Sequence, residues 1–303
     1  MSVTSSGLLL IDKPPAHTSH DVVARTRRLA GTRKVGHAGT LDPMATGLLI
    51  LGVGSSTRLL TYIVGCDKQY SATIRLGQSS STDDAEGELS GLASSDDIAA
   101  IDQDAIATEI AALTGEIEQV PSTVSAIKID GKRAYARARA GETVELKART
   151  VTISEFELED VRRSPEHIDI DVRVTCSSGT YVRALARDIG ESLVVGGHLT
   201  RLRRTRIGPF AVADASELDG LVVADSMLPP AQAARMLFPV ATLDDERARA
   251  LGHGQRIDSR GLPDVDGPIA ALTEHDRLIG LVHVRGSDVR SLVNFPDDEY
   301  DDR

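Results

Sequence analysis

The chain has 303 residues, which is enough for two domains and at least one sizeable hydrophobic core. Its composition, 41% hydrophobic and 26% charged, is typical of a globular protein. No apolar run approaches the roughly 20 residues of a membrane-spanning helix, and the apolar run at residues 8–11 is too short for a signal peptide. Two distant cysteines, Cys66 and Cys176, predict reduced, buried thiols. We therefore expect a cytoplasmic protein with no membrane partner.

The net charge of −11 taken alone argues against binding to nucleic acid. The charge is unevenly spread, however, because residues 76–127 hold eleven acidic residues and no Lys or Arg, whereas residues 198–209 hold four arginines and no acid. Net charge concerns solubility, and a local basic face is what binds phosphates. RNA therefore stays open as a partner.

The first third of the chain alternates strand and helix signals. Apolar runs at residues 8–11 and 48–53 predict buried strands, and strict alternation over residues 68–76 predicts a strand with one polar face. Between them, Thr18 and Asp21 have the spacing of a capping box that opens a helix. The apolar side of this helix is expected to contain Val22, Thr26 and Leu29.

The middle of the chain has one irregular and three regular segments. Residues 78–104 are rich in Ser, Asp and Gly, which predicts a mobile connection. Apolar spacing over residues 106–113 predicts a helix ended by Gly115, and alternation over residues 168–175 predicts another strand. A helix follows, with an apolar stripe made of Val182, Leu185, Ala186, Ile189 and Leu193.

From about residue 240 the pattern changes to short strands with tight turns, at residues 269–272, 278–284 and 289–293. They follow a loop that contains Pro229 and Pro230. Across the whole chain, strands and helices are mixed without the regular alternation of a doubly wound fold. The fold class that we predict is therefore α+β, with a small β-rich module at the end.

The segment Gly36–Gly47, with the sequence GHAGTLDPMATG, is the most informative stretch for function. Its glycines permit close approach to a ligand, and it presents one acid, Asp42, from a constrained position. A turn in which Asp42 caps a following helix explains the same pattern equally well. A phosphate-binding P-loop is excluded because the Gly-Lys-Ser/Thr sequence is missing, and a metal site would need more ligands.

This segment resembles the catalytic motif of the TruB family of pseudouridine synthases, in which the single Asp is essential. Further segments resemble that family in the same order, and the resemblance spans about residues 7–210. They are Asp12–Pro14 with Thr18–Asp21, Lys68–Gln78, Pro121–Arg139, Cys176–Gly190 and Gly197–Arg204. One departure is Ala16, where the family usually has Gly. That difference questions the local turn and leaves the chemistry untouched.

The resemblance implies the pseudouridine-synthase fold, a mixed and mainly antiparallel sheet with flanking helices. It also implies an isomerase that converts uridine 55 in the tRNA T-loop to pseudouridine, with Asp42 as the nucleophile and the target base flipped out of its stack. The reaction changes no oxidation state and loses no group, so we expect no cofactor and no metal. The expected partner is tRNA, bound by a monomer that needs no guide RNA.

Three other residues take their expected roles from the resemblance. Arg183 would offset the cost of burying the Asp42 carboxylate, since a nearby cation lowers an Asp pKa by roughly 1–3 units; a solvated surface arginine is the alternative. Tyr70 would stack on the flipped base and relay a proton, and Leu202 would form a wall of the base pocket. Simple core packing is the alternative for both.

RNA-contacting roles are the least direct expectations. His37 would contact the RNA loop, and Asp84 matches an acidic position near the active site, with a solvated loop charge as its alternative. Lys13 is expected to be structural or to face the RNA. A basic insertion at about residues 120–148 would grip phosphates, with affinity falling steeply as salt rises, or would simply be a solvated charged face. Its candidate residues are Lys128, Lys132, Arg133, Arg137 and Arg139.

The domains that we expect are a catalytic domain at residues 1–235 and a C-terminal RNA-binding domain at residues 236–303, which resembles a PUA domain more weakly. Two rival functions stay open. One is a pseudouridine synthase that acts on another RNA, and the other is an RNA-binding or tRNA-folding module without catalysis.

Overall fold

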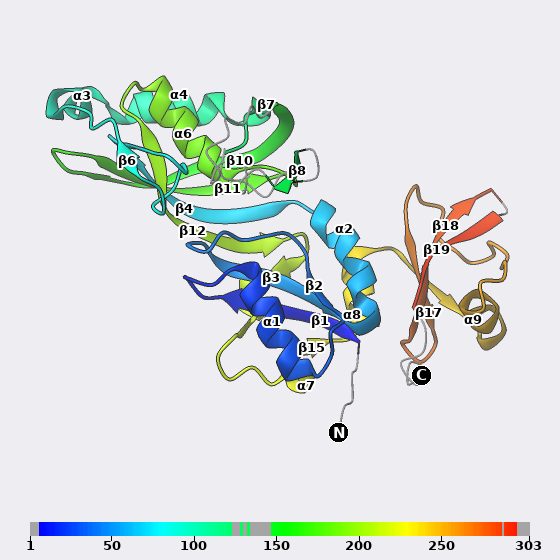
Figure 1. Cartoon of the computed structure of the whole chain (residues 1–303). Coiled ribbons are helices and arrows are strands. Elements are labelled where there is room, and N and C mark those ends of the chain that lie inside the picture. Colours follow the sequence, from blue (N-terminus) through cyan, green and yellow to red (C-terminus); the bar gives the residue numbers. More distant parts are fainter. Residues whose placement is uncertain (1–5, 123–127, 130–131, 134–146, 287, 296–303) are drawn as a thin grey trace. The chain divides into compact units, whose positions relative to one another are not determined.

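The computed structural model describes residues 6–122, 128–129, 132–133, 147–286 and 288–295 (Figure 1). The chain divides into two compact units. We call the first the terminal unit, because Met1–Pro43, Gly47–Val64 and Gly208–Arg303 belong to it. The second, the central unit, comprises Met44–Thr46 and Gly65–Ile207. Strands and helices are mixed and the strand pairs are mainly antiparallel, which confirms the predicted α+β class.

The N-terminal part of the terminal unit is built on β1 (Gly7–Lys13) and β3 (Thr46–Val53). They pair antiparallel, from Gly7 opposite Val53 to Lys13 opposite Gly47. Both strands are apolar runs without alternation, and their residues are almost all buried, as expected for strands covered on both faces. Three short strands add to them: β2 (Val35–His37) on β3, and β14 (Ser216–Glu217) and β15 (Met227–Leu228) on β1.

Helix α1 (Ser19–Ala30) begins with the predicted capping box. The Asp21 amide donates to Thr18 Oγ1 (3.1 Å) and the Thr18 amide donates to Asp21 Oδ2 (2.8 Å). The helix ends at Gly31 in the left-handed conformation. The prediction for Leu29 is wrong: it lies in the last turn and stays 48% exposed, and Val23 is buried instead.

The remaining elements of the terminal unit run from residue 54 to residue 294. Pro230 starts a helix in place of the predicted loop, because proline fits the first helical position, whose amide needs no partner. The three predicted terminal strands are confirmed and join a fourth in the order β16-β17-β18-β19. The bounds are η1 (Gly54–Leu59), α2 (Leu60–Gly65), β13 (Phe210–Ala211), η2 (Val212–Asp214), α7 (Val223–Ser226), α8 (Pro230–Leu237), β16 (Val240–Leu243), α9 (Asp245–Gly252), β17 (Ile269–Thr273), β18 (Leu278–Arg285) and β19 (Asp288–Asn294).

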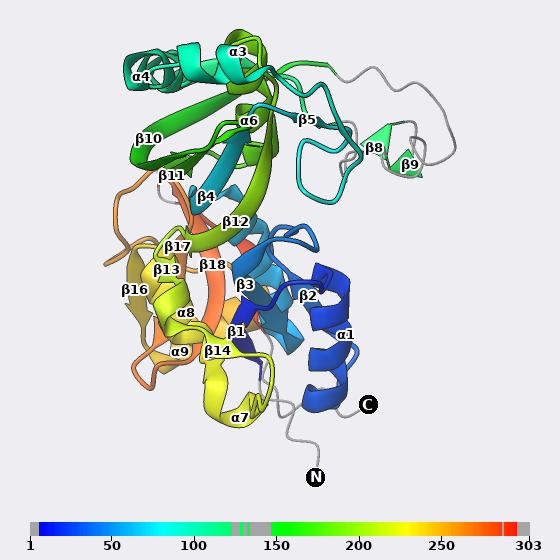
Figure 2. The same cartoon turned by 90° about the vertical axis from the view of Figure 1, so that its left-hand side faces the viewer.

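The central unit contains an antiparallel sheet in the order β12-β4-β11-β10-β7 (Figure 2). Its strands are β4 (Lys68–Leu76), β7 (Gly115–Gln119), β10 (Arg149–Arg163), β11 (Ile168–Cys176) and β12 (Gly197–Ile207). One face carries the apolar residues and is covered by helices α4 (Gln103–Ala112) and α6 (Val182–Ser192). Both the predicted strands and both the predicted helices of this unit are confirmed.

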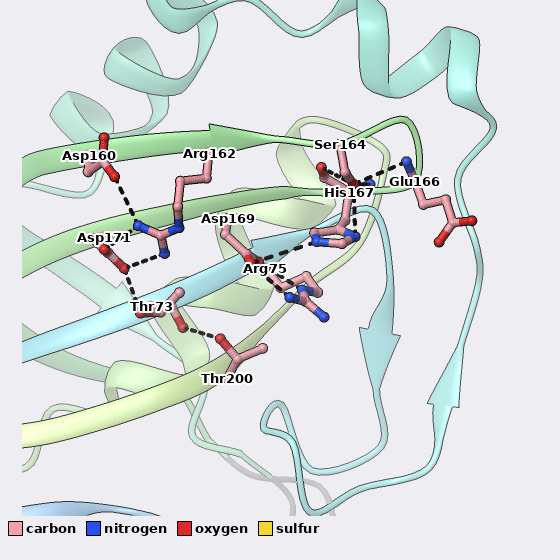
Figure 3. A network of polar contacts seen from close by, with 10 residues as sticks. All are labelled: Thr73, Arg75, Asp160, Arg162, Ser164, Glu166, His167, Asp169, Asp171 and Thr200. Carbon is pink, nitrogen blue, oxygen red and sulfur yellow. Dashed lines mark hydrogen bonds and ion pairs between the residues drawn. The ribbon is translucent and has the colours of Figure 1, made fainter.

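The opposite face of this sheet carries a cross-strand ladder of charges (Figure 3). Arg75 donates to both carboxylate oxygens of Asp169 at 2.8 Å, and Arg162 forms a second bidentate pair with Asp171. The hydrogen bonds from Arg162 are the main cause that lowers the pKa of Asp171 to about 2, and Thr73 adds a further one at 2.6 Å. These pairs satisfy the polar half of the alternating strand pattern.

The irregular connection predicted for residues 78–104 is wrong. The chain forms β5 (Ser79–Ser80), β6 (Leu89–Ser90) and α3 (Ser95–Ala100) there, and α3 has its own capping box. Polar composition was misleading because the two neighbouring acids of this segment are buried by partners far along the chain. They are Asp83 and Asp84. In the insertion, β8 (Lys128–Ile129) and β9 (Lys132–Arg133) pair as a hairpin.

Candidate active site

The Asp42 loop lies between β2 and β3, and Asp42 itself belongs to the terminal unit. Since the next element is a strand, the alternative in which Asp42 caps a helix is wrong. Asp42 itself is half-buried. The residue before it, Leu41, is fixed by the Ser19 hydroxyl: the Leu41 amide donates to Ser19 Oγ at 2.9 Å, and Ser19 Oγ donates to the Leu41 carbonyl at 3.1 Å. Ser19 is almost fully buried, so these bonds work without competing water.

The residue after Asp42 is fixed in the same manner. The Pro43 carbonyl accepts from the Ala16 amide at 3.0 Å and from Lys13 Nζ at 3.2 Å. The Lys13 ammonium also donates to the carbonyls of His17 and Pro14, and its side chain is fully buried. Of its two expected roles this geometry supports the structural one, because Lys13 ties the turn before α1 to the Asp42 loop.

Ala16, the departure from the family pattern, adopts φ +60°, a left-handed conformation that costs an alanine about 1–2 kcal/mol. The turn that the sequence left in doubt therefore forms, and it forms under strain. Its amide still reaches Pro43. The family glycine has a physical reason at this position, since glycine adopts the same φ without a steric penalty.

His37 ends β2, opposite Leu51 of β3. Its ring lies edge-to-face with His20 of α1, with 5.8 Å between the ring centroids. Gly39, two residues later, has φ +93°, which a side chain would strain. This turn leads the chain out of β2 towards Asp42. A contact between His37 and RNA stays a prediction.

Arg183 lies in the first turn of α6, in the central unit, and is buried, so the surface alternative is wrong. Its Nη1 donates to Asp84 Oδ2 and to the Thr82 carbonyl, both at 3.0 Å. Asp84 is 1% exposed, which also excludes a solvated loop charge. The other Asp84 oxygen accepts from Thr82 Oγ1 at 2.5 Å and from the Glu86 amide at 3.0 Å. Both partners of the ion pair are therefore desolvated and well bonded.

Tyr70 and Leu202 lie on neighbouring strands of the central sheet and are both buried. Leu202 pairs with Ala72, two residues from Tyr70, which places the two side chains on the same face. Burial agrees with core packing and with a wall of a base pocket alike. Their roles towards a base stay predictions.

Arg187, which the sequence analysis did not single out, lies one helical turn after Arg183. Its guanidinium contacts Asp188, Asp83 (3.3 Å) and the Val120 carbonyl (2.9 Å). Burial raises the pKa of Asp188 even though Arg187 acts in the opposite direction. Its spacing of four residues from Arg183 was a usable signal, since residues i and i+4 share a helix face.

The structure thus gathers the candidate residues in two groups. Lys13, His37 and Asp42 belong to the terminal unit, and Tyr70, Asp84, Arg183 and Leu202 belong to the central unit. Lys128, Lys132 and Arg133 fall on the β8–β9 hairpin, where only the backbone is described, and Arg137 and Arg139 lie outside the described residues.

Among the described residues, no group of three or more His, Cys, Asp or Glu side chains could hold a metal ion, and no helix is long and apolar enough to cross a membrane. Cys66 and Cys176 are reduced, as predicted; Cys176 is buried, but Cys66 is only half-buried, so the prediction of burial is wrong for Cys66. Burial raises the pKa of Cys176 to about 11, so this thiol is a poor nucleophile.

Comparison with known proteins decides the family. The model of the "TruB family pseudouridylate synthase (N terminal domain)" matches residues 27–182. The chain belongs to the TruB family. The model of the "tRNA pseudouridylate synthase B C-terminal domain" matches residues 183–242, and that of "tRNA Pseudouridine synthase II, C terminal" matches residues 238–296. The chain is therefore a pseudouridine-forming isomerase, as the motifs predicted.

Relatives of similar length support the same family. A tRNA pseudouridine synthase B of Leifsonia xyli is 59% identical over 300 residues, which is 99% of each chain. Proteins of the same name from Thermobifida fusca and Mycobacterium ulcerans are 53% and 50% identical and cover 96% and 95% of this chain, and 99% and 94% of their own lengths.

Solved structures confirm the fold. A Cbf5-Nop10-Gar1 complex contains a chain that is 26% identical, with a TM-score of 0.71, covering 96% of this chain and 86% of its own. A chain of an H/ACA RNP bound to a substrate RNA containing 2'-deoxyuridine is 24% identical, with a TM-score of 0.72, covering 97% of this chain and 86% of its own.

Proposed function

We propose that this enzyme converts uridine 55 in the T-loop of tRNA to pseudouridine, with Asp42 as its nucleophile. The names of the relatives, tRNA pseudouridine synthase B, support tRNA as the substrate class. The observation that carries the role of Asp42 is its loop, in which the main chain is fixed on both sides of one half-buried carboxylate. A nucleophile held in this manner loses little entropy when it meets the substrate.

The reaction breaks the bond between N1 of the base and C1′ of the ribose, turns the base, and joins C5 to C1′. Asp42 attacks either the ribose or the pyrimidine ring, and the covalent bond that it forms is broken again at the end. C5 loses its proton when the new bond is complete, and N1, which lost its bond to C1′, takes up a proton, so the product is an isomer of the substrate. No electron is gained or lost, and the chemistry asks for no cofactor.

The roles of the neighbouring residues follow from the same chemistry. Arg183 keeps the Asp42 carboxylate ionised in a site with little water. Tyr70 stacks on the flipped base, and Leu202 forms a wall of the base pocket. Asp84 holds the Arg183 guanidinium by an ion pair, and its own second oxygen is held in turn. His37 contacts the RNA loop from which the base has turned out.

RNA is bound by two further regions in this proposal. The basic insertion at about residues 120–148 contacts phosphates through Lys128, Lys132, Arg133, Arg137 and Arg139. Residues 236–303 form the second, a PUA-type module, which the family match over residues 238–296 supports. The enzyme acts as a cytoplasmic monomer and selects its uridine without a guide RNA.

Release of tritium tests this function. A tRNA transcript labelled with tritium at uridine C5 is incubated with the enzyme, and released tritium is counted. We expect release by the wild type, none by Asp42→Asn, and none from a transcript with cytidine at position 55. Asp219→Asn, at an exposed position in the same unit, is the matched control and should keep full activity. A wild type that releases nothing would leave an RNA-binding module without catalysis, whereas equal release by Asp42→Asn would refute Asp42 as the nucleophile.

A further inference from the structure

Arg183 is held by residues 119–122, the last two of which begin the family-like segment Pro121–Arg139 but had no expected role in the active site. Residues 119–122 start at the last residue of β7. Two hydrogen bonds join them to the N-cap residue of α6, one joins them to Arg187 in the middle of that helix, and one joins them to the Thr82 carbonyl in the turn that carries Asp84. We infer that Gln119 and Ser122 are positioning residues, which aim the Arg183 guanidinium without contacting the substrate. This inference rests on the proposed role of Arg183.

Gln119 fixes the N-terminal end of α6. Its Nε2 donates to the Tyr181 carbonyl (3.1 Å), and its Oε1 accepts from the Tyr181 amide (2.8 Å). Tyr181 is the N-cap residue of α6 and offers no side-chain cap of its own. Gln119 is 1% exposed, so water does not replace these bonds. The position at which α6 begins, two residues before Arg183, is therefore set by a side chain from β7.

Ser122 fixes the turn that carries Asp84. Its hydroxyl donates to the Thr82 carbonyl at 3.1 Å, and the same carbonyl accepts from Arg183 Nη1 at 3.0 Å. Both lone pairs of this oxygen are thus in use, and Ser122 fixes the acceptor onto which the guanidinium is aimed. Ser122 is 1% exposed, and its bond spans 40 residues of sequence, which excludes a local turn as its purpose.

Arg187 forms a further link between residues 119–122 and this turn. It donates to the Val120 carbonyl at 2.9 Å and to Asp83 Oδ2 at 3.3 Å, so one guanidinium joins the 119–122 segment to the same turn. Asp83 has φ +59°, a conformation that aspartate tolerates better than most residues and that surrounding contacts must maintain. Several contacts therefore fix the conformation of the turn that carries Asp84, as expected where a charged side chain must keep one orientation.

A double-mutant cycle with Arg183 separates positioning from mere stabilisation. Initial rates of tritium release are measured with Ser122→Ala, Arg183→Lys and the double variant. Lysine keeps the charge but lacks the planar fork, so the Thr82 carbonyl can no longer aim it. We expect Ser122→Ala to lower kcat about tenfold with KM unchanged, and to change kcat less than twofold in the Arg183→Lys background.

The matched control is Ser154→Ala, which removes another hydroxyl that donates to a distant carbonyl in the central unit, that of Thr175 in β11 (3.1 Å). It should leave kcat unchanged. A Ser122→Ala enzyme that behaves like Ser154→Ala, or that loses the same factor in both backgrounds, overturns the inference.

Amide hydrogen exchange reads the geometry independently of activity. Gln119→Leu should expose the Tyr181 amide and raise the exchange rate of residues 181–184, with the rest of α6 unchanged. Unchanged exchange would overturn the role of Gln119. A wild type that releases no tritium would instead refute the proposed function, while the exchange experiment would still decide how Arg183 is held.

Discussion

The Asp42 loop and the surroundings of Arg183 position their functional groups by different means. Around Asp42 the bonds go to main-chain groups, from a hydroxyl, an amide and one ammonium. Around Arg183 main-chain carbonyls also accept hydrogen bonds, but here two buried carboxylates, Asp84 and Asp83, form ion pairs with Arg183 and Arg187. We call the hydrogen bonds to the main chain of Leu41 and Pro43 the main-chain clamp; its strength depends on the geometry of these bonds. The stability of a buried ion pair depends on both of its charges, because an unbalanced charge in the interior is costly. The two regions should therefore respond differently to substitution.

The largest effect should come from Asp84. Replacing it with alanine removes the carboxylate from a buried pair, and breaking such a pair costs about 3–5 kcal/mol of the free energy of unfolding. Urea denaturation of Asp84→Ala against the wild type measures this loss. The matched control is Asp160→Ala, which breaks the ion pair of an exposed carboxylate with Arg162 and should cost at most about 1 kcal/mol. Equal losses would mean that burial does not distinguish the two pairs.

The main-chain clamp should give a smaller loss. Ser19→Ala leaves both the amide and the carbonyl of Leu41 buried without their partner, and we expect a cost of about 2–3 kcal/mol together with reduced tritium release. Thr26→Val is the matched control on the same helix, because Thr26 Oγ1 is buried and has no hydrogen-bond partner among the described residues. It should be neutral or slightly stabilising. If both variants lose the same stability, the clamp contributes nothing.

Sequence patterns predicted the elements whose residues repeat regularly. The alternation over residues 68–76 became β4 with the same bounds, and the capping box at Thr18 starts α1 as expected. They failed for residues 79–100, since the Asp83 and Asp84 carboxylates are buried only through α6, a hundred residues later. The composition of a segment gives the polarity of its residues, but it does not show whether a distant segment supplies a partner that allows a polar side chain to be buried.

The same limit applies to the site. The motifs contain Ser19 and Ser122 as well as Asp42 and Arg183, but they gave no role to the side chains that hold these two charged groups. Ser19, Gln119 and Ser122 act on main-chain groups that lie 22, 62 and 40 residues away in sequence. A serine or glutamine bonded to a backbone carbonyl leaves no recognisable spacing, because any residue supplies that carbonyl. Such positioning residues are found only when the fold is known.

Ala16 is the one weak point of the main-chain clamp, and it gives the smallest effect. Ala16→Gly removes the strain of φ +60°, about 1–2 kcal/mol, and adds about 0.5–1 kcal/mol of unfolded-state entropy. The net expectation is a gain of about 0.5–1 kcal/mol in the free energy of unfolding, measured by urea denaturation. Ala24→Gly, at an exposed position inside α1, should lose about 1 kcal/mol. Opposite signs for the same substitution would show that backbone conformation decides the outcome, and a loss at both positions would show that the turn before Asp42 is unstrained.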